Sequence, residues 1–108
     1  MTGEFDLIER IRARVLSRDD VRLGIGDDAA VLAVPAGRHL VVAMDTLNAG
    51  VHFPAETAPA DIGWKALAVN LSDLAAMGAV PAWCTVSLSM PAADVPWVDA
   101  FLDGFDAL

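Results

Sequence analysis

The sequence predicts an α+β fold in which helices cover a mostly antiparallel sheet of four strands. Two observations lead to this prediction. Apolar residues recur at helical spacing in three segments, and short apolar or alternating runs bounded by glycine and proline lie between them. The order α-β-β-β-α-β-α is typical of an antiparallel sheet with helices packed on it. A length of 108 residues is that of one domain, so we predict a single domain over residues 1–108.

Three helices are predicted, each with its own start signal. The first covers residues 4–17. The second is expected over 61–78, from a capping Asp61 to a closing glycine, and the third begins at a capping Asp94 with Pro96 in its first turn. The predicted core-facing residues are Leu7, Ile8, Ile11 and Val15 in the first helix, Trp64, Leu67, Leu71 and Leu74 in the second, and Val98, Phe101, Leu102 and Phe105 in the third.

Four segments are predicted to be strands. Residues 21–25 form a short apolar run that ends in glycines, and residues 29–34 and 40–45 flank a connection typical of a hairpin. Residues 83–90 alternate between apolar and polar side chains, which is the period of a strand with two different faces. Cys84 belongs to the apolar face, so we expect it to pack rather than react.

Composition narrows the classes of function. The net charge is −8, which argues against nucleic acid as a partner because phosphate backbones attract basic surfaces. No apolar run reaches the roughly 18 residues of a membrane span, so no membrane partner is expected. A single cysteine excludes an internal disulfide and fits a reducing, cytoplasmic compartment.

Aspartates in apolar surroundings are the main functional signal. Three segments carry them: residues 24–28 (GIGDD), 44–46 (MDT) and 70–73 (NLSD). Removing an ionised carboxylate from water costs several kcal/mol unless a partner compensates it. The chain has few cations of its own, six arginines and one lysine, and Lys65 lies close in sequence to residues 70–73. A divalent cation such as Mg²⁺ is the natural compensation, since it binds carboxylates together with phosphate.

Asp73 is the strongest single candidate. Its neighbours on the predicted helix face include Ala66, Val69 and Met77, where a solvated face would carry charged residues. We therefore expect this helix to be buried on both sides and Asp73 to belong to a site. The alternative is a surface aspartate on an alanine-rich helix.

The other candidates are weaker one by one. Asp27 and Asp28 follow glycines that permit a tight turn, Asp45 ends an apolar run, and a lone histidine such as His52 is more often structural. The sequence contains no phosphate-binding P-loop, dinucleotide fingerprint or zinc-ligand spacing. Any nucleotide chemistry would therefore depend on metal ions that bridge phosphates.

Several segments together resemble a known family. They are residues 3–5 (GEF), 24–31 (GIGDDAAV), 45–47 (DTL), 50–53 (GVHF) and 64–79 (WKALAVNLSDLAAMGA). In this order they resemble the N-terminal domain of the thiamine-monophosphate kinases. A looser form of the last segment occurs in the wider superfamily of aminoimidazole-ribonucleotide synthetase, selenophosphate synthetase and hydrogenase maturation proteins.

The resemblance implies a specific chemistry. It implies transfer of the γ-phosphoryl group of ATP to thiamine monophosphate, which gives thiamine diphosphate. Mg²⁺ ions would be held at Asp28, Asp45 and Asp73, with Asp27 in the same motif, and His52 would contact the substrate. It also implies a homodimer in which the sheets of two chains join into a barrel, with ATP near the interface.

Two features depart from the family pattern. Ala43 and Met44 stand where the family has serine and threonine, which removes a hydroxyl ligand. The family also continues past position 108 with a Gly-Gly-Asp-Thr segment, phosphate-binding arginines and a second α/β domain. We therefore expect this chain to be the N-terminal part of the enzyme and to turn over poorly alone. The alternatives are a non-catalytic Mg-nucleotide-binding and dimerisation module, or another member of the same superfamily.

Overall fold

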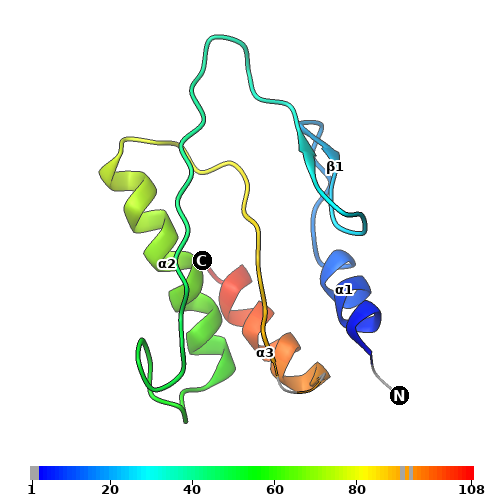
Figure 1. Ribbon diagram of the computed structural model, residues 1–108, viewed down its shortest axis with the longest axis vertical. Coiled ribbons are helices and arrows are strands. Elements are labelled where there is room, and N and C mark those ends of the chain that lie inside the picture. The colour runs from blue at the N-terminus through cyan, green and yellow to red at the C-terminus, as the bar shows by residue number, and fades with distance from the viewer. Residues whose placement is uncertain (1–2, 91, 93) are drawn as a thin grey trace. The chain divides into compact units, whose positions relative to one another are not determined.

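The computed structural model describes residues 3–90, 92 and 94–108 and divides the chain into two compact units. Residues 1–40 form the first unit and residues 41–108 the second, and each is described by itself. The first unit contains one helix and two short strands, and the second contains two helices, with one long segment before the first of them and another between them (Figure 1). The α+β class predicted from the sequence is confirmed at this level.

The first unit begins with helix α1, Glu4–Arg12. The backbone N–H of Gly3 donates to the Asp6 carboxylate at 2.9 Å, which satisfies one of the free donors at this helix start. The helix is shorter than the 4–17 segment predicted. The N–H groups of Arg14 and Val15 bond to carbonyls three residues back, and this tighter winding closes the helix early.

Strand β1, Val21–Leu23, pairs with β2, Val31–Leu32, in an antiparallel two-stranded sheet. This pairing corresponds to the first two of the four predicted strands. Segments 40–45 and 83–90 are extended but are not assigned as strands within the described residues. A strand needs a hydrogen-bonded neighbour, and neither segment has one among the residues that the structure describes.

The second unit begins its regular structure with α2, Pro59–Ala76. The prediction that Asp61 caps this helix was wrong, because Pro59 occupies the first turn and Ala58 is the cap residue. Asp61 lies in the first turn instead, where a negative charge complements the helix dipole. The predicted stop is confirmed by Gly78, whose φ of +68° suits glycine best.

Helix α3, Val95–Asp106, packs against α2 (Figure 1). Asp94 caps it as predicted, since its carboxylate accepts the Trp97 N–H at 3.1 Å. The described buried hydrophobic residues lie between these helices; they are Ile62, Val98, Phe101 and Leu102. Phe101 also stacks with Trp97 and Phe105, at ring-centroid distances of 5.4 and 6.2 Å. The apolar face predicted for the last helix therefore forms the core.

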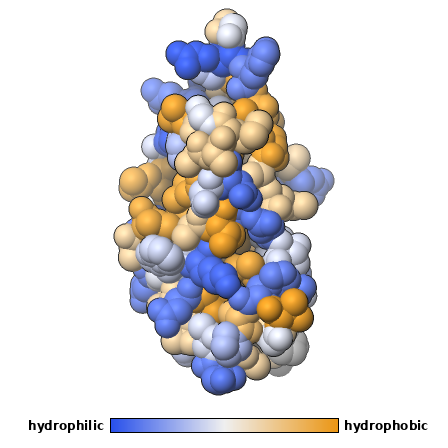
Figure 2. All heavy atoms as spheres, turned by 90° about the vertical axis from the view of Figure 1, so that its left-hand side faces the viewer, coloured by the Kyte–Doolittle hydropathy of each residue, from blue (hydrophilic) through white to orange (hydrophobic). Residues whose placement is uncertain are grey.

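The predicted burial of α2 on both sides is wrong for the single chain. Its buried residues are Ile62 and Gly63, whereas Trp64 is 49% exposed. Helix α3 approaches α2 closely at Gly63, so the buried face of α2 differs from the predicted one that includes Trp64. Figure 2 shows many hydrophobic side chains at the surface among hydrophilic ones. Within the described residues, no helix combines the length and the hydropathy needed to cross a membrane.

Candidate metal and phosphate site

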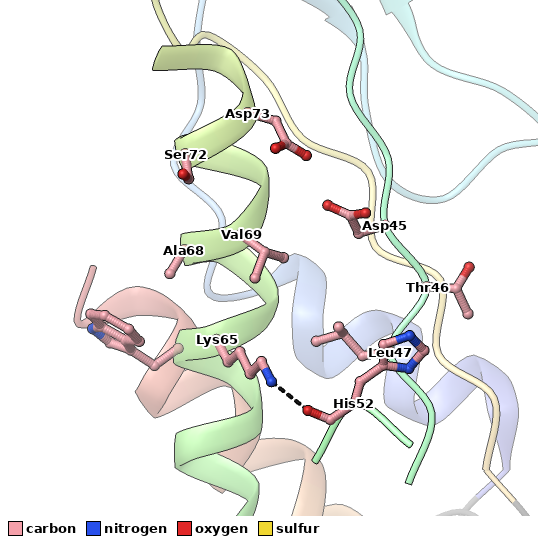
Figure 3. Close-up of a pocket in the computed structure, with 10 residues that line it drawn as sticks. Asp45, Thr46, Leu47, His52, Lys65, Ala68, Val69, Ser72 and Asp73 are labelled. Atoms are coloured by element: carbon pink, nitrogen blue, oxygen red, sulfur yellow. Dashed lines mark hydrogen bonds between the residues drawn. The ribbon is translucent and has the colours of Figure 1, made fainter. Parts of the chain in front are cut away.

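A pocket of about 550 Å³ opens in the second unit beside α2 (Figure 3). One wall is the helix itself, and the other is the chain from Asp45 to His52. Its lining residues are Asp45, Thr46, Leu47, His52, Trp64, Lys65, Ala68, Val69, Ser72 and Asp73. Three of the residues singled out in the sequence, Asp45, His52 and Asp73, therefore share one pocket.

Asp45 and Asp73 form the acidic end of this pocket. Figure 3 shows their carboxylates pointing toward one another from the extended segment and from α2. A shared hydrogen bond with Asp45 and, after it, the repulsion of the Asp45 charge raise the pKa of Asp73. Two facing carboxylates without a cation between them therefore hold a proton more readily, and a cation would relieve the same repulsion.

The position of Asp73 on α2 adds to this unfavourable charge. Asp73 lies near the carboxyl end of the helix, where the helix dipole is negative, and no basic residue occupies the last turn. The side chain is exposed, so solvent and ions reach it. A divalent cation bound beside Asp73 would offset this unfavourable negative charge. Mg²⁺ takes one or two carboxylates together with phosphate oxygens, and Asp45 and Asp73 fit that donor set.

Helix α2 presents charges of both signs to the pocket. Lys65, Val69 and Asp73 are spaced four residues apart, which places them in one row along a helix face. Lys65 lies two turns before Asp73, so the row carries a cation toward the start of the helix and an anion toward its end. A phosphorylated ligand with bound Mg²⁺ presents complementary charges to both.

His52 lies on a tight loop over residues 48–53. The His52 N–H donates to the Asn48 carbonyl at 2.9 Å, and the Gly50 N–H donates to the Phe53 carbonyl at 2.6 Å. Gly50 has a φ of +76°, a conformation that glycine adopts without strain. The imidazole Nδ1 accepts the Asn48 N–H at 2.8 Å, and the Lys65 ammonium donates to the His52 carbonyl (Figure 3).

Asp27 and Asp28 belong to the first unit, where they lie in an exposed turn after β1. The Asp28 N–H donates to the Asp27 carboxylate at 2.8 Å, and Gly26 has a φ of +117°. The structure thus brings together Asp45 and Asp73 within one unit. Across residues 3–90, 92 and 94–108, no group of three or more His, Cys, Asp or Glu side chains is arranged to hold a metal ion.

Sequence reasoning missed several pocket residues, above all Lys65. The available signal was its spacing, four residues before Val69 and eight before Asp73, which places all three in one row of the helix. Cys84 also differs from its prediction, since it is exposed rather than packed in a core. Its segment lacks the neighbouring strand that would cover it.

Comparison with known proteins places the chain in a family. The model of the "AIR synthase related protein, N-terminal domain" family matches residues 26–108. The chain belongs to this family. The match includes the acidic turn at residues 27 and 28 and the whole pocket lined by Asp45 and Asp73.

Relatives within this AIR synthase related family carry one recurring name. A thiamine-monophosphate kinase of Salmonella typhimurium is 56% identical over 107 residues, covering 98% of this chain and 33% of the relative. The thiamine-monophosphate kinase of Escherichia coli K12 is 56% identical over 108 residues, with the same coverage. That of Bacillus subtilis is 48% identical over 89 residues. The chain spans about a third of the length of the first two relatives and 27% of the third.

A solved structure has the same fold. The crystal structure of thiamine-monophosphate kinase from Stenotrophomonas maltophilia K279a matches with a TM-score of 0.83 and 68% sequence identity. The match covers 98% of this chain and 34% of that one.

Proposed function

We propose that this chain is the N-terminal, Mg²⁺- and ATP-binding part of a thiamine-monophosphate kinase. The complete enzyme would transfer the γ-phosphoryl group of ATP to the phosphate of thiamine monophosphate, forming thiamine diphosphate and ADP. The observation that carries the proposal is the Asp45–Asp73 pair, which lies in one pocket with His52 in a chain 56% identical to enzymes of that name.

The residues of the pocket suggest distinct roles. Asp45 and Asp73 would hold Mg²⁺, which neutralises phosphate charge during phosphoryl transfer when it is bound. We further propose that Asp28 of the first unit, with Asp27 beside it, also binds Mg²⁺. The support is the GIGDD motif and its position within the residues matched by the family model. His52 would contact thiamine monophosphate from the opposite wall of the pocket.

The test is a Mg²⁺-dependent assay of thiamine diphosphate formation with the complete gene product that carries this sequence. Asp73→Asn removes a proposed metal ligand with little change in size. We expect it to raise the Mg²⁺ concentration required for half-maximal rate by at least about tenfold, as losses at metal sites commonly do. Asp61→Asn is the matched control, because Asp61 is an exposed aspartate of the same helix outside the pocket.

The outcomes separate the candidate functions. Turnover of thiamine monophosphate supports the kinase, while Mg-ATP binding without turnover supports a binding and dimerisation module. Equal Mg²⁺ requirements in wild type, Asp73→Asn and Asp61→Asn would show that Asp73 is not a metal ligand. The 108-residue chain alone is expected to show little turnover, because the resemblance assigns phosphate-neutralising groups to the segment beyond it.

We also propose that the chain forms a homodimer in which segments 40–45 and 83–90 become strands of a larger, barrel-like sheet. Both segments are extended, and Val42 and Met44 are 78% and 85% exposed although they are apolar. Hydrogen bonds with a second copy would satisfy the backbone and cover these side chains. Light scattering coupled to size exclusion tests this, and a monomer at micromolar concentration would contradict it.

A cytoplasmic location is proposed from the ATP requirement.

A further inference from the structure

The position of His52 depends on two hydrogen bonds that come from different parts of the second unit. The first is the local bond from the Asn48 N–H to Nδ1, at 2.8 Å. The second comes from the Lys65 ammonium, 13 residues along the chain on α2, to the His52 carbonyl. The ring is therefore oriented by its own loop, whereas the loop is fixed to the helix by Lys65 (Figure 3).

The bond from the Asn48 N–H to Nδ1 determines which tautomer the neutral imidazole of His52 adopts. An Nδ1 atom that accepts a hydrogen bond carries no proton, so the proton of the neutral ring is on Nε2. His52 thus offers a single N–H donor at Nε2 to the pocket that it lines. Such a donor suits a phosphate oxygen or another acceptor on a bound molecule, and its direction follows from the position of the loop.

The second bond determines where that donor lies relative to the acidic pair. The backbone bonds from Val51, His52 and Gly50 have their acceptors within residues 48–53, so they shape the loop without attaching it to α2. Lys65 is half-buried and lies in the same row of α2 as Asp73. It thereby connects the wall that carries His52 to the helix that carries the proposed metal ligand.

We propose that Lys65 is a positioning residue for the phosphate acceptor, which acts by holding the His52 loop against α2. This inference rests on the proposed kinase function and assigns a role to Lys65, for which the family resemblance implied none. Loss of the Lys65 bond frees the loop to move relative to Asp45 and Asp73, and its internal bonds then open more often. The affinity for thiamine monophosphate then falls, while the site for Mg-ATP keeps its carboxylates.

The test is a double-mutant cycle in the complete gene product. Lys65→Met removes the donor and keeps an unbranched side chain that is one atom shorter, and His52→Ala removes the ring. We expect Lys65→Met to raise the KM for thiamine monophosphate about tenfold, with less than a twofold change in the KM for ATP. In the His52→Ala background the same substitution should have little further effect, because Lys65 acts through His52. Lys65→Arg should restore most of the affinity, since guanidinium also donates to a carbonyl.

A second measurement follows the loop without substrate or turnover. The amide of Asn48 is protected from hydrogen exchange by its bond to the His52 ring, so Lys65→Met should speed its exchange and Lys65→Arg should not. Asp61→Asn serves as the control for general effects on α2.

The two proposals fail in different ways. Absence of thiamine monophosphate turnover in the wild-type protein overturns the kinase function, whatever Lys65 does. Additive effects of Lys65→Met and His52→Ala, or an equal rise in the KM for ATP, overturn the positioning role while leaving the kinase intact. Unchanged Asn48 exchange in Lys65→Met also overturns that role.

Discussion

Gly104 of α3 lies directly against the backbone of Ala60 in α2. A Cβ atom at position 104 would overlap the carbonyl group of Ala60, and one at Gly63 would overlap the carbonyl of Phe101. The two glycines therefore allow the helices to approach closely at two neighbouring points. This contact fixes the face of α2 that is buried and leaves the opposite region, with Lys65 and Asp73, for the pocket.

Gly104→Ala should consequently destabilise the protein. Within a helix, alanine is normally favoured over glycine by about 1 kcal/mol, so the usual sign of this substitution is stabilising. Here the added methyl group must push two helix backbones apart, and we expect a net loss of about 1–3 kcal/mol in the free energy of unfolding. Urea denaturation measures the change. Gly24→Ala is the control, because its Cβ would meet only the Val21 side chain at 3.4 Å. A stabilised Gly104→Ala protein would contradict the close helix contact.

The cap of α3 gives a second prediction. Asp94→Ala removes the acceptor of the Trp97 N–H and should lower the free energy of unfolding by about 1 kcal/mol. Asp94→Asn keeps a side-chain oxygen at the same place and should lose only a small part of this. If the alanine and asparagine variants unfold at the same denaturant concentration, the bond from the Trp97 N–H to the side chain at position 94 contributes nothing to stability.

Local signals in the sequence predicted the parts of the fold that depend on local interactions. The Asp94 cap and the stripe of Val98, Phe101 and Leu102 define α3 and its buried face, because caps and helical spacing act within a few residues. Asp61 was assigned as a cap in error because the proline two residues earlier starts the helix. Proline and aspartate are both common at the start of a helix, so the sequence alone does not show which of Pro59 and Asp61 lies at the first turn.

Features that depend on distant parts of the chain could not be predicted in the same way. Alternation in residues 83–90 indicates two different faces, but it does not say whether a neighbouring strand is present to pair with them. The Lys65 bond is to a main-chain carbonyl 13 residues away, and any residue type at position 52 provides that acceptor. The proximity of Asp45 and Asp73 was expected from the family resemblance, whereas their metal-binding role stays a prediction.

The thiol of Cys84 should show a pH dependence that reflects its surroundings. The residue is exposed overall, but partial burial of the sulfur raises the pKa of the Cys84 thiol. The thiolate is the reactive form, so alkylation by iodoacetamide at neutral pH should be slower in the native protein than in urea. The native rate should increase at higher pH than the unfolded rate does. Equal rates in the two states across this pH range would show that the sulfur is not shielded.

The last prediction concerns the acidic pair in the absence of metal. Asp45 raises the pKa of Asp73 above its usual value, so the folded protein binds this proton more tightly than the unfolded chain does. By linkage, the pair favours folding at pH values below the ordinary carboxyl pKa. This contribution is lost as the pH rises through the raised pKa of Asp73, beyond which the two charges repel. In chelator-treated protein at neutral pH, Asp73→Asn should therefore melt at a temperature equal to or above that of the wild type.

Magnesium should reverse this order. Binding to the folded wild type stabilises it in proportion to occupancy, so its melting temperature should rise with MgCl₂ concentration. Asp73→Asn lacks one of the proposed carboxylate ligands and should show a much smaller rise over the same concentrations, whereas Asp61→Asn should follow the wild type. Scanning calorimetry with and without Mg²⁺ measures both effects in one series. If the melting temperature of Asp73→Asn rises with Mg²⁺ as much as that of the wild type, magnesium binds elsewhere and Asp73 is not one of its ligands.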